Sequence, residues 1–131
     1  MINDSGKVVG VEHIKQLYDM SIKNICKHHE NLLKEQKVIL DNCDGRMGYK
    51  KYAPYKAIHV GAAAPSIPDE LINQLDFNGR MFIPVGGQNE AQWIYIIDKD
   101  SKGNITQNRV LSVNYVPLTD AEKQLRNIRK K

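Results

Sequence analysis

The stretch Tyr55–Pro65, with the sequence YKAIHVGAAAP, restricts the fold of this chain more than any other segment. Its apolar run from Ala57 to Val60 is typical of a strand with both faces covered. Gly61 and three alanines follow. Their small size lets a backbone or a ligand come close, and Pro65 then stops further regular pairing. Because ligands of open α/β sheets bind beyond the carboxyl ends of the strands, we expect either a ligand-binding turn here or a tight turn that binds nothing.

Length and composition limit the class of protein. The 131 residues suit one domain with its own core, and 19 lysines and arginines against 15 acids give a net charge of +4, too small to indicate nucleic-acid binding. Cys26 and Cys43 lack metal-type spacing and are expected to be reduced thiols of a cytoplasmic protein. No run is long enough for a membrane span, and MINDSG has no signal-peptide core. We expect a single domain over residues 1–131, without a metal site and without nucleic-acid or membrane partners.

The first third of the chain alternates strands and a helix. Lys7–Glu12 (KVVGVE) is expected to be a buried strand that ends in an acid, and Lys37–Leu40 starts a second strand. Between them, apolar and small residues at helical spacing predict an amphipathic helix: Ile14, Leu17, Tyr18, Ser21, Ile22 and Ile25. His28–Gln36 is polar and is expected to fray or form a loop. The turn-rich loop Asp41–Gly48 (DNCDGRMG) follows the second strand.

The rest of the chain predicts a short helix, more strands and a final helix. Ser66 and Asp69 have capping-box spacing before a helix Asp69–Leu75, which Gly79 is expected to end. A strand Arg80–Val85 follows, and its Pro84 favours a strand end or an edge position. The runs Ala91–Ile97 and Val110–Val116, joined by a polar turn, predict an antiparallel hairpin. A helix from Thr119 to about Arg129 is expected last, with Thr119 and Glu122 as a second capping box.

Three features are expected at one edge of the sheet. In nucleotide-binding α/β folds, an acid at the end of the second strand accepts hydrogen bonds from the two ribose hydroxyls, and Glu12 fits that place. Asp44 and Gly45, an acceptor followed by a residue without a side chain, could contact an adenine. Each also has a simpler interpretation, since strands often end in exposed acids and Asp-Gly is a common turn. Together with the turn Gly61–Ala64 they predict a ligand site.

Five segments, in this order, resemble protein-L-isoaspartate O-methyltransferases: GKVVGVEHIKQL, CDGRMGY, PYKAIHVGAAAP, GRMFIPVGG and NYVPLTDAEKQ. The resemblance runs from Gly6 to about Gln124 and covers the carboxyl-terminal part of the family. It implies transfer of a methyl group from S-adenosylmethionine to the free carboxylate of L-isoaspartyl and D-aspartyl residues in damaged proteins, which makes isoaspartyl proteins and peptides the partners. S-adenosylhomocysteine would be the product, and members of the family are monomeric cytoplasmic repair enzymes.

The resemblance also implies roles for single residues. The cofactor would be bound by Glu12 at the ribose with His13 beside it, by Asp44 and Gly45 at the adenine, and by Thr119 and Gln124 from the last helix. Thr119 is equally suited to cap that helix. The backbones of Gly61, Ala62 and Ala63 would border the isoaspartyl substrate.

One departure from the family is large. The glycine-rich loop of such folds comes roughly 20 residues before the ribose-binding acid, whereas eleven residues precede Glu12. We therefore expect an incomplete Rossmann-like S-adenosylmethionine-dependent methyltransferase fold, lacking its first strand and Gly-rich loop, with a carboxyl-terminal antiparallel hairpin and helix. The family's active-site serine would lie in the absent part, so no catalytic residue is expected in this chain.

Losing the first strand would remove the centre of the sheet, between the strands Lys7–Glu12 and Tyr55–Val60. Unpaired edges and bare apolar surface would follow, so we expect a chain that is inactive alone and either poorly stable or self-associating. Two other functions stay open. A truncated homologue could act as a non-enzymatic interaction module, and the basic end Arg126–Lys131 could bind nucleic acid, although a solvated helix end explains that cluster equally well.

Overall fold

The structure is a computed structural model that describes residues 5–87 and 90–128. The elements, in chain order, are β1 (Val8–Val11), α1 (Lys15–Cys26), α2 (Glu30–Lys34), β2 (Val38–Asp41), the 3-10 turns η1 (Gly45–Met47) and η2 (Lys50–Tyr52), β3 (Tyr55–His59), α3 (Asp69–Gln74), β4 (Leu75–Val85), β5 (Gln92–Lys99), β6 (Ile105–Val113) and α4 (Ala121–Ile128). They form two compact units, a first unit of Met1–Gly45 with Asp120–Lys131 and a second unit of Arg46–Thr119.

The first unit is built on a parallel strand pair. β1 and β2 run in register from Val8 opposite Val38 to Val11 opposite Asp41, as valine-rich runs favour. A Cβ atom on Gly10 would lie 2.7 Å from Cδ2 of Leu40, so glycine lets the two strands pack closely. Val8 is nevertheless exposed, because β1 has one strand partner in this sheet. The expectation of a fully buried strand was therefore wrong for β1.

Helices α1 and α2 of the first unit differ from expectation in opposite ways. α1 forms where the apolar spacing predicted it, yet none of its residues is buried, and Ile14, just before the helix, is the buried residue at 5% exposure. α2 forms where a loop was expected. Its ends are joined by an ion pair of 2.8 Å between Lys34 Nζ and Glu30 Oε2, and the Lys37 N–H donates to the Leu32 carbonyl at 2.9 Å after the helix.

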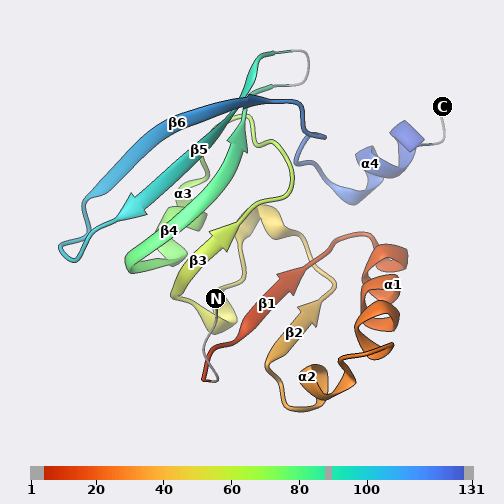
Figure 1. The fold of residues 1–131 in the computed structure, drawn as a ribbon. Coiled ribbons are helices and arrows are strands. Elements are labelled where there is room, and N and C mark those ends of the chain that lie inside the picture. The colour runs from red at the N-terminus through yellow and green to blue at the C-terminus, as the bar shows by residue number, and fades with distance from the viewer. Residues whose placement is uncertain (1–4, 88–89, 129–131) are drawn as a thin grey trace. The chain divides into compact units, whose positions relative to one another are not determined.

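The second unit is a four-stranded mixed sheet in the order β3-β4-β5-β6 (Figure 1). β3 and β4 are parallel, and β4, β5 and β6 are successively antiparallel, which confirms the hairpin. β3 is an edge strand, so Lys56 and His59 are exposed and the expectation that both its faces are covered was wrong. Pro84, the next-to-last residue of β4, lies beyond the end of β3, where its carbonyl accepts from the Ala64 N–H at 3.0 Å. Its predicted position at a strand end is confirmed.

β4 begins at Leu75, five residues earlier than Arg80, where the sequence predicted it. Helix α3 ends at Gln74, so Gly79 does not stop it. Instead Gly79 is buried within the strand, where a Cβ would lie 2.6 Å from the carbonyl oxygen of Asp76. Gly79 therefore allows the backbone of Asp76 to come close, a common reason for a glycine within a strand.

Both predicted capping boxes were wrong. Pro68 occupies the N-cap of α3 without a side-chain hydrogen bond, so Ser66 does not cap that helix. Before α4 the Asp120 carboxylate accepts from the Lys123 N–H at 2.8 Å, which is the N-cap hydrogen bond expected of Thr119. Aspartate is at least as good an N-cap as threonine, and it lies one residue closer to the helix.

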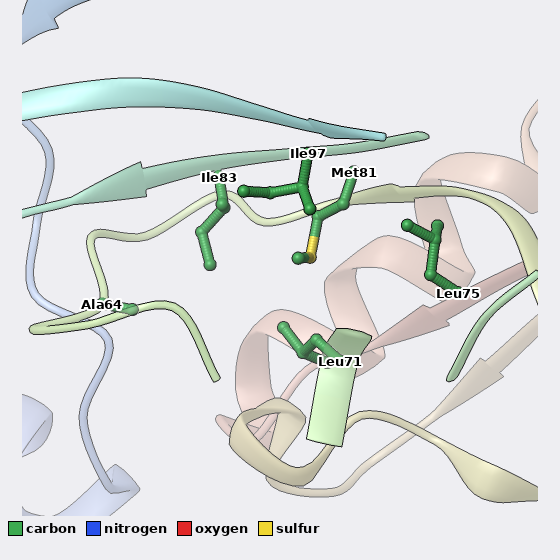
Figure 2. Close-up of a cluster of buried hydrophobic side chains, with 6 residues drawn as sticks. All are labelled: Ala64, Leu71, Leu75, Met81, Ile83 and Ile97. Atoms are coloured by element: carbon green, nitrogen blue, oxygen red, sulfur yellow. The ribbon is translucent and has the colours of Figure 1, made fainter. Parts of the chain in front are cut away.

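The core of the second unit lies between α3 and one face of the sheet. Figure 2 shows Leu71 of α3 pointing toward Met81, with Ile83, Ile97 and the other labelled side chains around them. These residues are almost fully buried together, and they are Ala64, Leu71, Leu75, Met81, Ile83 and Ile97. Ala64 brings the turn after β3 into this core, so the position of that turn depends on core packing.

Candidate functional site

The carboxyl ends of β1 and β2 meet at one edge of the first unit, where Glu12 follows β1. The Glu12 N–H donates to the Asp41 carbonyl at 3.1 Å, and the Asn42 side chain donates to the Glu12 carbonyl at 2.7 Å. Oxygen Oε1 of Glu12 accepts from the Ile14 N–H at 2.8 Å, which orients the carboxylate. An ionised carboxylate offers about four acceptor positions, so one hydrogen bond leaves capacity for a diol.

Asp44 and Gly45 lie in the loop that continues from β2 at the same edge. A Cβ on Gly45 would be 3.0 Å from Cγ2 of Val11, the last residue of β1, so the loop passes directly over the end of that strand. Cys43, beside Asp44, is half-buried, and burial, with Asp41 and Asp44 nearby, raises the pKa of its thiol. The loop therefore places the acceptor Asp44 and a thiol of raised pKa near the end of β1.

Helix α4 joins this edge through one hydrogen bond. His13 Nε2 and Gln124 Oε1 are 2.6 Å apart, and because the amide oxygen can only accept, the imidazole nitrogen donates. The bond joins the residue after Glu12 to the last helix, 111 positions along the chain. Arg126 of α4 pairs with Glu122 at 3.0 Å, while the other basic residues of the predicted cluster, Arg129–Lys131, lie outside the described residues.

The predicted substrate turn lies in the second unit between two backbone segments. Ala63 donates its N–H to the Val116 carbonyl at 2.9 Å and accepts from the Leu118 N–H at 2.7 Å, which forms a parallel bridge to Pro117. Ala64 makes the equivalent bridge to Val85 at the end of β4. Thr119 directly follows Leu118. The pairing therefore brings Thr119, one of the residues predicted to bind the cofactor, close to the predicted substrate turn.

Gly61, two residues before Ala63, is exposed and has no internal reason to be glycine. A Cβ there would meet only the His59 ring, at 4.0 Å, among the described residues. The contrast is Gly48, with a φ of +65°, where a Cβ would lie 2.3 Å from the Gln74 side chain. Packing and backbone conformation explain Gly48 but not Gly61.

The predicted site residues thus form two groups. Glu12, His13, Asp44, Gly45 and Gln124 belong to the first unit, and Gly61, Ala62, Ala63 and Thr119 to the second. Their roles stay predictions, as does the single domain over residues 1–131.

The sequence did not indicate the roles of three polar residues, Asn42, Gln74 and Gln92. Asn42 could have been found because it follows a strand inside a turn-rich loop. Gln74 and Gln92 are buried glutamines that bond to backbone far away in sequence, and nothing local indicates this. Residues 5–87 and 90–128 contain no group of three metal-ligating side chains, and no helix among them is long and apolar enough to cross a membrane.

The chain matches a sequence model of the protein-L-isoaspartate(D-aspartate) O-methyltransferase family over residues 1–123. It is 47% identical to protein-L-isoaspartate O-methyltransferase 1 of Arabidopsis thaliana, covering 96% of this chain and 54% of the relative. Identity to the enzyme of Caenorhabditis elegans is 48%, covering 95% of this chain and 55% of the relative. The chain therefore spans about half the length of the curated relatives it matches.

A crystal structure gives a matching fold. It is of a putative protein-L-isoaspartate O-methyltransferase from Plasmodium falciparum in complex with S-adenosyl-L-homocysteine. The TM-score is 0.75 at 29% identity, over 86% of this chain and 52% of the other.

Fold and comparisons together define an α/β protein of the methyltransferase class, as the sequence predicted. The chain belongs to the protein-L-isoaspartate(D-aspartate) O-methyltransferase family.

Proposed function

We propose that this chain forms the ribose and adenine side of the cofactor site, and the substrate border, of an isoaspartyl methyltransferase. The reaction is transfer of a methyl group from S-adenosylmethionine to the free carboxylate of L-isoaspartyl and D-aspartyl residues in damaged proteins, in the cytoplasm. The observation that carries the proposal is the meeting of Glu12, the Asn42–Gly45 loop and the His13–Gln124 hydrogen bond at one strand edge. The chain alone is proposed to be inactive.

The residues at this edge suit a nucleoside. Glu12 is held by the Ile14 N–H and can accept from two vicinal hydroxyls. Asp44 supplies an acceptor for an exocyclic amine, and Gly45 lets a flat base approach the loop. S-adenosyl-L-homocysteine, which the Plasmodium falciparum protein binds, contains both groups.

The proposed methyl transfer needs little general acid–base catalysis from the chain. The bound cofactor would supply a methyl group on a positively charged sulfur, and a carboxylate is already an adequate nucleophile toward it. The chain's part is to hold the substrate in line and to exclude water. Gly61 and Ala62 fit that part, because Gly61 leaves open space beside the backbone. Ala63 already uses its N–H and carbonyl within the unit, so its contribution would be shape.

Cofactor binding is tested by an NMR titration of the chain with S-adenosylhomocysteine. We expect shifts at the amides of Glu12, His13 and Gly45, with an affinity weaker than micromolar, and their loss in Glu12→Ala. The matched control Glu35→Ala removes an exposed acid of the same unit that pairs with Lys37. Shifts confined to other residues would refute the proposed site. Micromolar binding would refute the claim that the site is incomplete.

Methyl transfer is tested by adding the amino-terminal half of the Arabidopsis thaliana relative, the part that this chain does not match. Radioactive methyl from S-adenosylmethionine should reach an isoaspartyl peptide only in the mixture, and the aspartyl peptide of the same sequence should stay unlabelled. Equal labelling of the two peptides would refute the substrate class.

The second candidate, a non-enzymatic interaction module, is favoured by one observation. β6 is an edge strand of the second unit, with Val110 56% and Leu111 60% exposed. Cofactor binding in the titration separates the two candidates, since a pure interaction module needs no nucleoside site.

A further inference from the structure

Gln92 is a buried polar residue that bonds to the segment paired with the proposed substrate turn. It is 5% exposed, at the first position of β5. Its Oε1 accepts from the Tyr115 N–H at 2.6 Å, and its Nε2 donates to the Tyr115 carbonyl at 3.2 Å. One side-chain amide thus satisfies both polar backbone atoms of one residue, as a neighbouring strand would.

The segment held by Gln92 is the one that pairs with the turn. Tyr115 immediately precedes Val116, whose carbonyl accepts from the Ala63 N–H, and Leu118 donates to the Ala63 carbonyl. Pro117, opposite Ala63, has no N–H to donate. The bridge needs no hydrogen bond from Pro117, because Val116 and Leu118 on either side of it make both bonds to Ala63. The position of Ala63 therefore depends on the position of residues 115–118.

The other side of the turn is held by the end of β4 and by Gly86. Ala64 donates to the Pro84 carbonyl at 3.0 Å and accepts from the Gly86 N–H at 2.9 Å. Gly86, with a φ of +149°, also makes room for Gln92, since a Cβ there would lie 2.9 Å from Cγ of Gln92. The turn is thus held between the end of β4 and the segment 115–118.

We infer that Gln92 is a positioning residue for substrate recognition, acting through Tyr115 and the Val116–Leu118 segment on the turn Gly61–Ala63. It makes no contact of its own with the substrate. The inference rests on the proposed function in taking that turn as the substrate border. A displaced turn would fit the isoaspartyl group less well and so bind it more weakly. Errors of about 1 Å in positioning can also cost up to about 100-fold in rate.

A matched control exists in the same unit. Gln74, 4% exposed, accepts from the Tyr49 N–H at 2.7 Å and donates to the Met47 carbonyl at 2.8 Å. Gln74→Leu and Gln92→Leu therefore delete equivalent pairs of buried hydrogen bonds, and a general loss of stability affects both. Only Gln92→Leu should act on the substrate turn.

Amide hydrogen exchange of the full chain tests the positioning without any ligand. Gln92→Leu should speed exchange at Ala63 and Leu118 by about tenfold over Gln74→Leu, which should instead speed exchange at Tyr49. Equal exchange at Ala63 and Leu118 in the two variants would overturn the inference. Should Gln92→Leu fail to fold, Gln92→Glu replaces it. A protonated glutamate can both accept and donate, so protection of Ala63 should return as the pH is lowered from 8 to 5.

Binding of an isoaspartyl peptide, followed by NMR shifts at Gly61 and Ala62, tests the consequence. Gln92→Leu should weaken binding about tenfold and Gln74→Leu should leave it unchanged; an unchanged affinity in Gln92→Leu would overturn the inference. If the wild-type chain binds the isoaspartyl and aspartyl peptides equally, the proposed function is refuted instead. The hydrogen exchange rate at Ala63 would still show whether Gln92 positions the turn.

Discussion

Gly61 and Gly48 differ in the space that a side chain would find. Gly61→Val should change the free energy of unfolding by no more than about 0.5 kcal/mol, because its Cβ enters open space. It should weaken isoaspartyl peptide binding, since the new side chain occupies the substrate side of the turn. Gly48→Ala is the contrast and should cost about 1–3 kcal/mol, because its Cβ would overlap the Gln74 amide at positive φ. Chemical denaturation and peptide titration measure both effects. A strongly destabilised Gly61→Val would contradict the functional interpretation.

The two thiols should differ in reactivity for reasons visible at each residue. Burial, with Asp41 and Asp44 nearby, raises the pKa of Cys43, so less of it is thiolate at neutral pH, whereas Cys26 is exposed. Iodoacetamide should label Cys26 first, and the labelling rate of Cys43 should rise only at higher pH than that of an ordinary thiol. Peptide mapping by mass spectrometry reads both sites, with Cys26→Ser as control. S-adenosylhomocysteine should slow Cys43 further, since the thiol adjoins the proposed adenine contact. Equal rates would contradict this account.

At the scale of elements, the turn between β5 and β6 depends on one carboxylate. Asp100 Oδ1 accepts from the Lys102 and Asn104 N–H groups at 2.8 and 2.9 Å, and Oδ2 accepts from the Asn104 side chain at 2.8 Å. The Asn104 side chain and backbone lower the pKa of Asp100 below its ordinary 3.8. The carboxylate therefore stabilises the turn at pH values above 3.8, and this stabilisation is lost as the pH falls through the lower folded-state pKa. Exchange protection of the β5–β6 amides should be higher than in Asp100→Asn at pH 6, and the difference should shrink toward pH 3. A difference independent of pH would refute the role of the charge.

Secondary-structure elements could be predicted from the sequence where the local residue pattern agrees with the packing. The strands β1, β2 and β3 and the β5–β6 hairpin form where apolar runs and turn residues predicted them. The early start of β4 was missed because it depends on contacts such as Lys99 Nζ donating to the Leu75 carbonyl at 2.7 Å, which links residues 24 positions apart. Helix α2 was missed although its ion pair and the hydrogen bond after it are local, because its sequence is largely polar. The two hydrogen bonds between the Gln92 side chain and the Tyr115 backbone could not be predicted either, because Tyr115 is 23 positions away. The candidate residues came from family resemblance and lone signals, and the backbone pairing that groups Thr119 with Gly61–Ala63 came only from the structure.

At the scale of the whole molecule, strand edges and exposed apolar side chains should govern association. β1 has β2 as its partner in a two-stranded sheet, and β3 and β6 are the edges of the four-stranded one. On β6, Val110 and Leu111 are exposed next to a register shift between Ile94 and Tyr95. Such edges pair with other chains unless charge blocks them. We therefore expect the chain to self-associate as its concentration rises.

A lysine at the exposed edge should reduce this association. Val110→Lys removes apolar surface and places a charge on β6, so sedimentation velocity should show a smaller average mass than for wild type at equal concentration. Thr106→Lys is the matched control, because it adds the same charge to an exposed polar position of the same strand. If both variants reduce the mass equally, net charge and not the apolar edge drives association. A wild-type chain that stays monomeric and melts in one sharp, reversible transition would refute the expectation, and would mean that the open strand edges are compatible with a stable isolated chain.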